Sequence, residues 1–154
     1  MPAELATFVD IDAAPERVWQ VLTDLPAYAE WNPFITEADG AFVVGERLTV
    51  RVPPVNAFVP AILRPTVVEV TPCRRLRLWS RLDRLAIPGL FHVELTWTIS
   101  DHDGGVRLWQ QDQFGGLLAP LLFRSLNRHR LPAFNQMNAA LKHHVEGTSP
   151  GQRP

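Results

Sequence analysis

Apolar residues recur along the chain with two different spacings, and the change between them separates helical from extended segments. Residues 5–12 alternate loosely between polar and apolar side chains, which is typical of a strand. Within residues 15–24, apolar side chains follow at i, i+3 and i+4, the spacing of one helix face. Residues 26–30 predict a further helical turn that ends before Pro33, because proline disfavours helical geometry in the residue preceding it. The early chain therefore predicts a strand and two short helices.

Between residues 34 and 114 the spacing changes to two, which indicates half-buried strands. The alternation is clearest in 91–100 and 106–114, and the Asp-Gly-Gly sequence between them suits the positive φ angles of a tight hairpin turn. Shorter alternating stretches lie at 48–52, 66–71 and 75–82. We expect an antiparallel meander of about six strands here, and about seven strands in the whole chain.

The helical spacing returns after the two glycines at 115 and 116 and continues to Glu146. Such a helix would be about 45 Å long at 1.5 Å per residue, and Pro132 is expected to kink it. Residues 147–154 are rich in Gly, Pro and Ser, a composition typical of a frayed tail. Because no repeat or linker interrupts the chain, the sequence predicts one α+β domain over residues 1–146 and a flexible tail over 147–154.

Composition narrows the class of protein. A chain of 154 residues with 46% hydrophobic and 20% charged residues suits one globular domain. The formal charge of −1 argues against nucleic acid as a partner. The first seven residues lack the features of a secretory signal, and the apolar run 115–123 is far shorter than the roughly 20 residues of a membrane span. We therefore expect a cytoplasmic monomer or homodimer without stable membrane insertion.

Particular residues at both ends of this layout match a known family. They are Val18-Trp19, Leu22-Thr23-Asp24, Tyr28 and Trp31-Asn32-Pro33-Phe34 near the start, and Asp112-Gln113-Phe114-Gly115-Gly116-Leu117 and Met137-Asn138 with Ala140-Leu141-Lys142 near the end. With these residues the chain resembles the START-like (SRPBCC) superfamily, and within it the polyketide cyclase/dehydrase-type branch. The resemblance implies the Bet v 1-like helix-grip fold, in which a curved antiparallel sheet closes around a long C-terminal helix.

The resemblance also implies a cavity between the sheet and the C-terminal helix that holds a small hydrophobic molecule. The strand patterns indicate which side chains face it, although polar ones among them can equally bond to neighbouring groups, because an unpartnered buried polar group costs about 1–3 kcal/mol. Likewise Trp31 can be a core anchor and Asn32 a turn residue. The expected ligand-binding residues are Trp31, Asn32, Phe34, Val50, Val68, Leu78, Ser80, Phe91, Leu95, Trp97, Leu108, Gln110, Phe114, Leu122 and Leu126.

Signals for catalysis are sparse. No nucleophile elbow or phosphate-binding glycine loop is present, the histidines lack the spacing of a zinc motif, and Cys73 has no histidine close in sequence. We expect no metal and no cofactor. Asp112 is the single acid–base candidate, because burial in an apolar pocket would raise its pKa.

Members of the superfamily differ in function, so three hypotheses stay open. The first is a noncovalent binding protein for a lipid-like or aromatic ligand. The second is an enzyme of the polyketide cyclase/dehydratase type, in which Asp112 assists with Gln110 or Ser80 nearby. The third is an interaction protein resembling chaperone activators, which would use Trp79, Trp109 and neighbouring arginines on the outer face of the sheet.

Overall fold

The structure is a computed structural model of the 154-residue chain and describes residues 3–53, 61–83, 85 and 87–147. It has an α+β architecture. In chain order the elements are β1 (Ala3–Ile11), α1 (Pro15–Thr23), η1 (Leu25–Ala27), α2 (Tyr28–Trp31), β2 (Glu37–Asp39), β3 (Thr49–Arg51), β4 (Ile62–Leu63), β5 (Thr66–Thr71), β6 (Arg75–Arg81), β7 (His92–His102), β8 (Gly105–Gly115) and α3 (Ala119–Gly147). Among the described residues, no helix combines the length and apolar character needed to cross a membrane.

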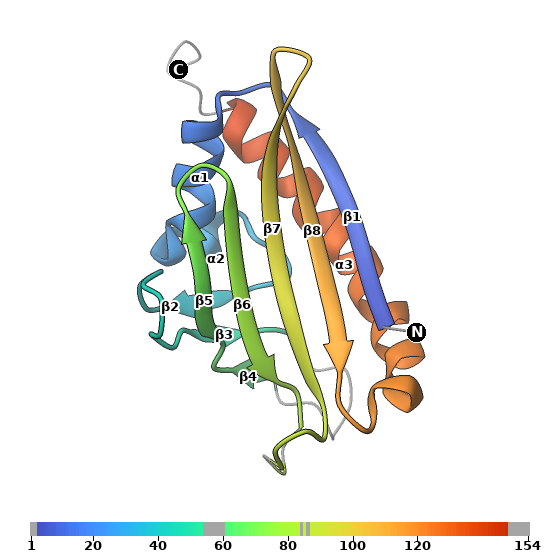
Figure 1. The fold of residues 1–154 in the computed structure, drawn as a ribbon. Helices are drawn as coiled ribbons and strands as arrows, with labels where there is room; N and C mark the ends of the chain where they lie inside the picture. The colour runs from blue at the N-terminus through green and yellow to red at the C-terminus, as the bar shows by residue number, and fades with distance from the viewer. Residues whose placement is uncertain (1–2, 54–60, 84, 86, 148–154) are drawn as a thin grey trace.

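Five antiparallel strands form the main sheet in the order β1-β8-β7-β6-β5. Figure 1 shows them as one curved layer, with α3 lying diagonally across one face behind β1 and β8. The sheet thus closes on a long C-terminal helix, and the predicted helix-grip fold is confirmed. The hairpin between β7 and β8 is also confirmed, because Asp103 and Gly104 both have positive φ, at 45° and 83°.

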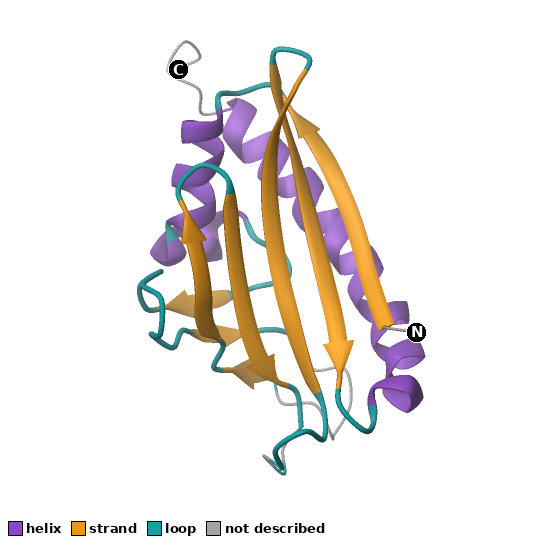
Figure 2. Ribbon diagram, in the orientation of Figure 1, coloured by secondary structure: helices purple, strands orange, loops and turns teal. Residues whose placement is uncertain are grey.

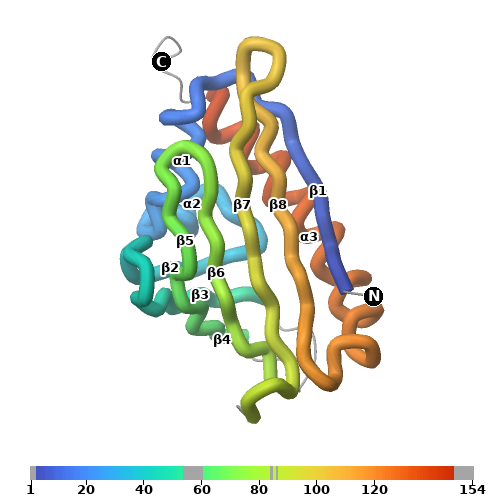
Figure 3. Tube along the Cα trace, in the orientation of Figure 1, coloured from blue at the N-terminus to red at the C-terminus, as the bar shows by residue number. Residues whose placement is uncertain are grey.

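A second sheet of three short strands, β2-β3-β4, lies on the same side of the main sheet as α3 (Figures 2 and 3). Three backbone hydrogen bonds connect the segment before β3 with β5 and the residue preceding it. The N–H groups of Gly45 and Leu48 donate to the carbonyls of Val67 and Pro65, and the N–H of Val67 donates to the carbonyl of Glu46. The described chain therefore has eight strands, one more than expected. Strands β2 and β4 were missed because segments of three and two residues are too short to show a period of two.

The alternation of polar and apolar residues predicts the inward faces of β6, β7 and β8 correctly. In β6 the side chains of Leu76, Leu78 and Ser80 are buried, and in β7 and β8 every second side chain points inward. In β5 the prediction is wrong. The register shifts between Val67 and Glu69, so Val67 is 1% exposed and Val68 is 41% exposed. A bulge exchanges the faces of the residues that follow it, and no sequence period reveals that exchange.

Helix α3 continues through Pro132 as one helix of 29 residues. Proline removes one backbone hydrogen bond of the helix, and packing of the buried face, which includes Leu126, Phe134 and Leu141, offsets that loss. The predicted tail at 148–154 lies outside the described residues.

Two side chains in the last turns of α3 bind the end of β1. Glu146 Oε2 accepts a hydrogen bond from the backbone N–H of Asp12 at 2.8 Å. Lys142 Nζ donates to the carbonyl of Asp10 at 2.8 Å and pairs with Glu146 at 2.6 Å. The Asp12 N–H and the Lys142 ammonium hold the pKa of Glu146 below its ordinary value of 4.5. The two ends of the fold are therefore joined by an interaction that needs the ionised carboxylate.

Replacing Glu146 with Gln should lower the free energy of unfolding by about 1 kcal/mol at pH 7. A carboxyl whose native pKa is lowered stabilises above its unfolded pKa, and this contribution is lost as pH falls through the native value. The difference between wild type and Glu146→Gln should therefore shrink below pH 4.5. Urea unfolding at pH 7 and at acid pH measures this difference in the free energy of unfolding. Glu30→Gln is the control, because Glu30 is exposed on α2. A difference that does not change with pH would contradict this account.

Candidate ligand-binding site

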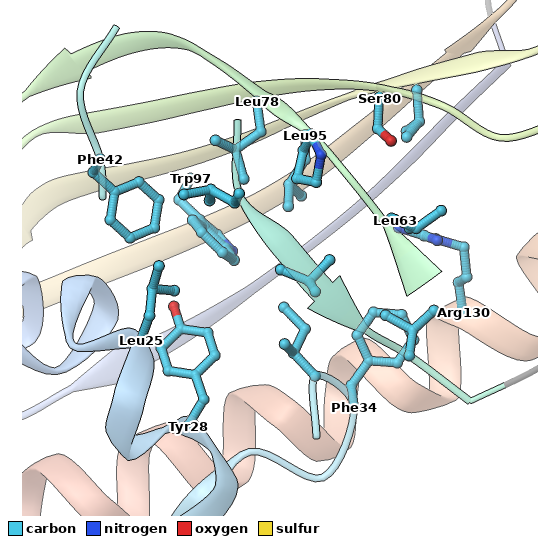
Figure 4. Close-up of a pocket in the computed structure, with 16 residues that line it drawn as sticks. Leu25, Tyr28, Phe34, Phe42, Leu63, Leu78, Ser80, Leu95, Trp97 and Arg130 are labelled. Carbon is cyan, nitrogen blue, oxygen red and sulfur yellow. The ribbon is translucent and has the colours of Figure 1, made fainter. Parts of the chain in front are cut away.

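An apolar pocket lies between β6 and β7 on one wall and β3, β4 and the η1–α2 segment on the other (Figure 4). Successive side chains of a strand point to opposite faces, so the inward-facing residues of both sheets point into the same space. Sixteen residues line the pocket, and four of them have polar side-chain atoms. They are Leu25, Tyr28, Phe34, Ile35, Phe42, Leu48, Val50, Val52, Leu63, Pro65, Leu78, Ser80, Val93, Leu95, Trp97 and Arg130.

The space in this pocket is small. The centre of a water-sized sphere can occupy about 50 Å³. That volume holds a few water molecules, since one needs roughly 10–15 Å³ by this measure. Leu95 is only partly buried although it lies on the inward face of β7, as expected of a side chain that borders open space. A ring-sized ligand therefore fits after lining side chains move.

The pocket is not where the sequence places it. The prediction put it between the sheet and α3, yet Arg130 is the sole lining residue that α3 contributes. Side chains fill the space where α3 faces β1 and β8, among them Phe134, Met137 and Leu141, each no more than 1% exposed. Buried side chains of this kind pack at a density close to that of organic crystals. The opening lies instead over the half of the main sheet that α3 does not cover.

Six predicted ligand-binding residues line the pocket: Phe34, Val50, Leu78, Ser80, Leu95 and Trp97. Four others are buried but do not line it: Phe91, Leu108, Phe114 and Leu126. Leu122 is partly buried and packs against the core, and Val68 is exposed to solvent. Period-two alternation identifies the inward face of a strand, but the position along the strand decides whether that face meets the pocket or the packed core.

Gln110 bonds within the protein. Its Oε1 accepts from Trp97 Nε1 at 2.9 Å, and its Nε2 donates to Asn138 Oδ1 at 2.5 Å. Asn138 in turn donates to Thr7 Oγ1 at 3.5 Å. This chain of hydrogen bonds joins β7, β8, α3 and β1 and satisfies the polar groups that the strand faces bury. Of the two alternatives left open for Gln110, bonding to neighbours is the one observed.

Asn32 and Trp31 also take the structural alternative. Asn32 Oδ1 accepts hydrogen bonds from the backbone N–H groups of Phe34 and Ile35, at 2.9 and 2.8 Å. Asn32 therefore fixes the turn after α2 and positions two lining residues. Trp31 packs with its ring centroid 5.2 Å from that of Tyr28 and 6.0 Å from that of His144, outside the pocket lining.

Asp112 forms a buried ion pair that the sequence did not predict. Arg130 Nε and Nη2 lie 2.8 and 2.6 Å from Asp112 Oδ2, and the two residues are 6% and 0% exposed. Asp112 Oδ1 has no hydrogen-bond partner. Burial raises the pKa of Asp112 above its ordinary value of 3.8, and the Arg130 guanidinium opposes that rise. The acid–base candidate is thus engaged with a cation, and it does not line the pocket.

Three phenylalanines surround the guanidinium of Arg130. Its central carbon lies 5.4 Å from the ring centroid of Phe34, 5.7 Å from that of Phe114 and 5.3 Å from that of Phe134. Desolvated cation–π contacts of this kind are favourable. A signal for Arg130 was present in the sequence, because it stands four residues from both Leu126 and Phe134 on the buried stripe of α3. A charged residue in that stripe implies a buried partner.

On the outer face of the main sheet, the tryptophans and arginines pair with their neighbours. Trp79 packs on His92 and Trp109 on Phe8, with ring centroids 5.5 and 4.9 Å apart. Arg107 Nε donates to Asp10 at 2.7 Å. These outer contacts are cross-strand packing of the ordinary kind.

Within the described residues, no group of three His, Cys, Asp or Glu side chains lies close enough together to bind a metal ion.

Removing one member of the buried ion pair should be costly. Arg130→Ala should lower the free energy of unfolding by roughly 3–5 kcal/mol, because it leaves Asp112 buried without a counter-ion. The double substitution Asp112→Leu with Arg130→Met should stay within about 1 kcal/mol of wild type. Since the isolated acid is favoured in its protonated form, the loss in Arg130→Ala should be smaller at pH 4 than at pH 8. Urea denaturation measures these free energies of unfolding. An equal loss of stability in Arg130→Ala and in the double variant would contradict the buried ion pair.

Comparisons with solved structures agree with the fold described above. A protein from Mesorhizobium loti superposes with a TM-score of 0.73 at 20% identity, covering 95% of this chain and 98% of that one. A START superfamily protein from Mycobacterium smegmatis gives 0.66 at 14% identity, with 95% and 99% covered. The di-domain ARO/CYC StfQ from the steffimycin biosynthetic pathway gives 0.72 at 11% identity, with 95% of this chain and 52% of that chain covered. At these identities the likeness shows the fold.

No curated protein matches the chain. The family model described as "Polyketide cyclase / dehydrase and lipid transport" matches residues 2–146, nearly the whole chain. The residues quoted from both ends of the sequence, the helix-grip fold and this match all agree. The chain therefore belongs to the polyketide cyclase/dehydrase and lipid transport family.

Proposed function

We propose that this protein binds a small hydrophobic molecule, lipid-like or aromatic, in the pocket between β6–β7 and β3–β4. The observation that carries the proposal is the apolar lining, in which twelve of sixteen residues have no polar side-chain atom. Ligand sites of this kind are concave and mostly apolar, with few polar groups that orient the ligand. Two walls from different sheets meet here.

The wall formed by the second sheet is the part suited to move. Strand β4 has two residues and pairs with β3 through two residue pairs, whereas β7 and β8 pair through eleven. Elements held by few hydrogen bonds open at lower free energy than central strands. Outward movement of β3, β4 and Phe42 would enlarge the pocket while the long β7–β8 pairing stays intact.

An enzyme of the polyketide cyclase/dehydratase type is the second candidate. It is favoured by the ion pair beside the pocket, in which burial raises the pKa of Asp112 and Arg130 reaches the lining. The similarity to the ARO/CYC protein StfQ adds to it. In this version Arg130 polarises a ketone oxygen of the bound chain, and Asp112, which does not line the pocket, holds Arg130 in position. Turnover of an aromatic poly-β-ketone analogue that survives Asp112→Asn unchanged would remove this candidate.

Filling the pocket should abolish binding. Val50→Phe, on the inward side of β3, should weaken binding of 4-fluoro-α-methylstyrene at least tenfold, because the added ring occupies the ligand space. Fluorine NMR titration measures the dissociation constant. Thr49→Phe is the matched control, because its side chain is exposed on the same strand. Binding that is equal in wild type and Val50→Phe would place the ligand elsewhere.

A further inference from the structure

The polar atoms of the pocket differ in what they can still offer a ligand. The Tyr28 hydroxyl donates to the carbonyl of Leu22. Trp97 Nε1–H donates to Gln110, and the Ser80 hydroxyl donates to the carbonyl of Arg81 at 3.0 Å. Three of the four polar lining side chains have therefore committed their hydrogen to the protein. Of the lining side chains, Arg130 alone keeps free donors.

Arg130 has five N–H hydrogens, and its bonds to Asp112 use Nε and Nη2. Among the described residues, no hydrogen-bond partner lies against Nη1. The guanidinium carbon lies 5.4 Å from the ring centroid of Phe34, and Figure 4 shows Arg130 at the opposite end of the pocket from Tyr28 and Phe42. Asp112 and the three phenylalanine rings hold the group in one orientation. A fixed donor therefore faces one end of an otherwise apolar space.

We propose that Arg130 anchors the ligand, and that the ligand is an apolar ring compound bearing one uncharged carbonyl oxygen, which accepts a hydrogen bond from Nη1. This inference rests on the proposed function and names the ligand class of the same site. Hydrogen bonds from a charged donor are the strong ones, especially where water is excluded.

Asp112 is the reason why the ligand oxygen is expected to be uncharged. The ion pair has no net charge, so a neutral carbonyl meets only the guanidinium dipole and its free hydrogens. A carboxylate ligand would bring a second anion close to Asp112 in a poorly solvated site, where like charges repel strongly. Asp112 is thus a positioning residue: it orients Arg130 and selects against anionic ligands.

Three probes of nearly equal shape test this proposal: 4′-fluoroacetophenone, 4-fluoro-α-methylstyrene and 4-fluorobenzoate. Fluorine NMR titrations against the full chain give three dissociation constants. The wild type should bind the ketone about tenfold more tightly than the alkene, because the two differ only in the oxygen, and should bind the benzoate most weakly. Equal affinity for ketone and alkene would overturn the role of Arg130 and leave the proposed function intact. Failure of all three probes to bind would instead overturn both.

Two variants separate anchoring from mere packing. In Asp112→Leu with Arg130→Met the preference for the ketone should fall to about one, whereas Arg128→Met, an exposed arginine on the same helix, should keep it. In Asp112→Asn the guanidinium becomes a net cation, so the benzoate should gain at least tenfold relative to the ketone. A structural role alone would not produce that reversal. Retained ketone preference in the double variant, or an unchanged benzoate ratio in Asp112→Asn, overturns the proposal, and near-ultraviolet circular dichroism verifies that each variant is folded.

Discussion

The ion pair between Asp112 and Arg130 restricts how α3 can lie on the main sheet. Taking two charges out of water is costly, and the pair is tolerated because the charges meet at 2.6–2.8 Å and because three aromatic rings enclose the cation. Any rotation of α3, or any slip of β8 by one residue, would leave a charge buried alone. The pair is therefore better understood as a constraint on geometry than as a source of net stability.

The pocket follows from that constraint. Where α3 covers the main sheet, Leu126, Phe134 and Met137 of the helix are buried. The Trp97–Gln110–Asn138 hydrogen bonds also link the helix to the sheet there. Where α3 no longer covers the sheet, the short strands β3 and β4 take its place. One wall of the pocket therefore belongs to long strands and the other to short ones, and strands held by fewer hydrogen bonds open at lower free energy.

Helix α3 joins these two parts. Its first half contributes Arg130 to the pocket, and its last turn binds the end of β1 through Lys142 and Glu146. On the outer face of the main sheet, side chains of neighbouring strands form ion pairs and aromatic contacts. Examples are Phe8 with Trp109 and Arg107 with Asp10. The proposed ligand contact therefore lies on the inner side of the main sheet, at Arg130.

The sequence alone determined the order of the longer elements and the inward faces of β6, β7 and β8, because the periods of two and 3.6 are properties of the local backbone. It also identified Phe34, Leu78 and Trp97 as inward residues. Tertiary structure decided the rest. The bulge that exposes Val68, the pairing of Asp112 with Arg130, and the position of the pocket beyond α3 depend on which residues distant in sequence meet, and periodicity carries no information about that.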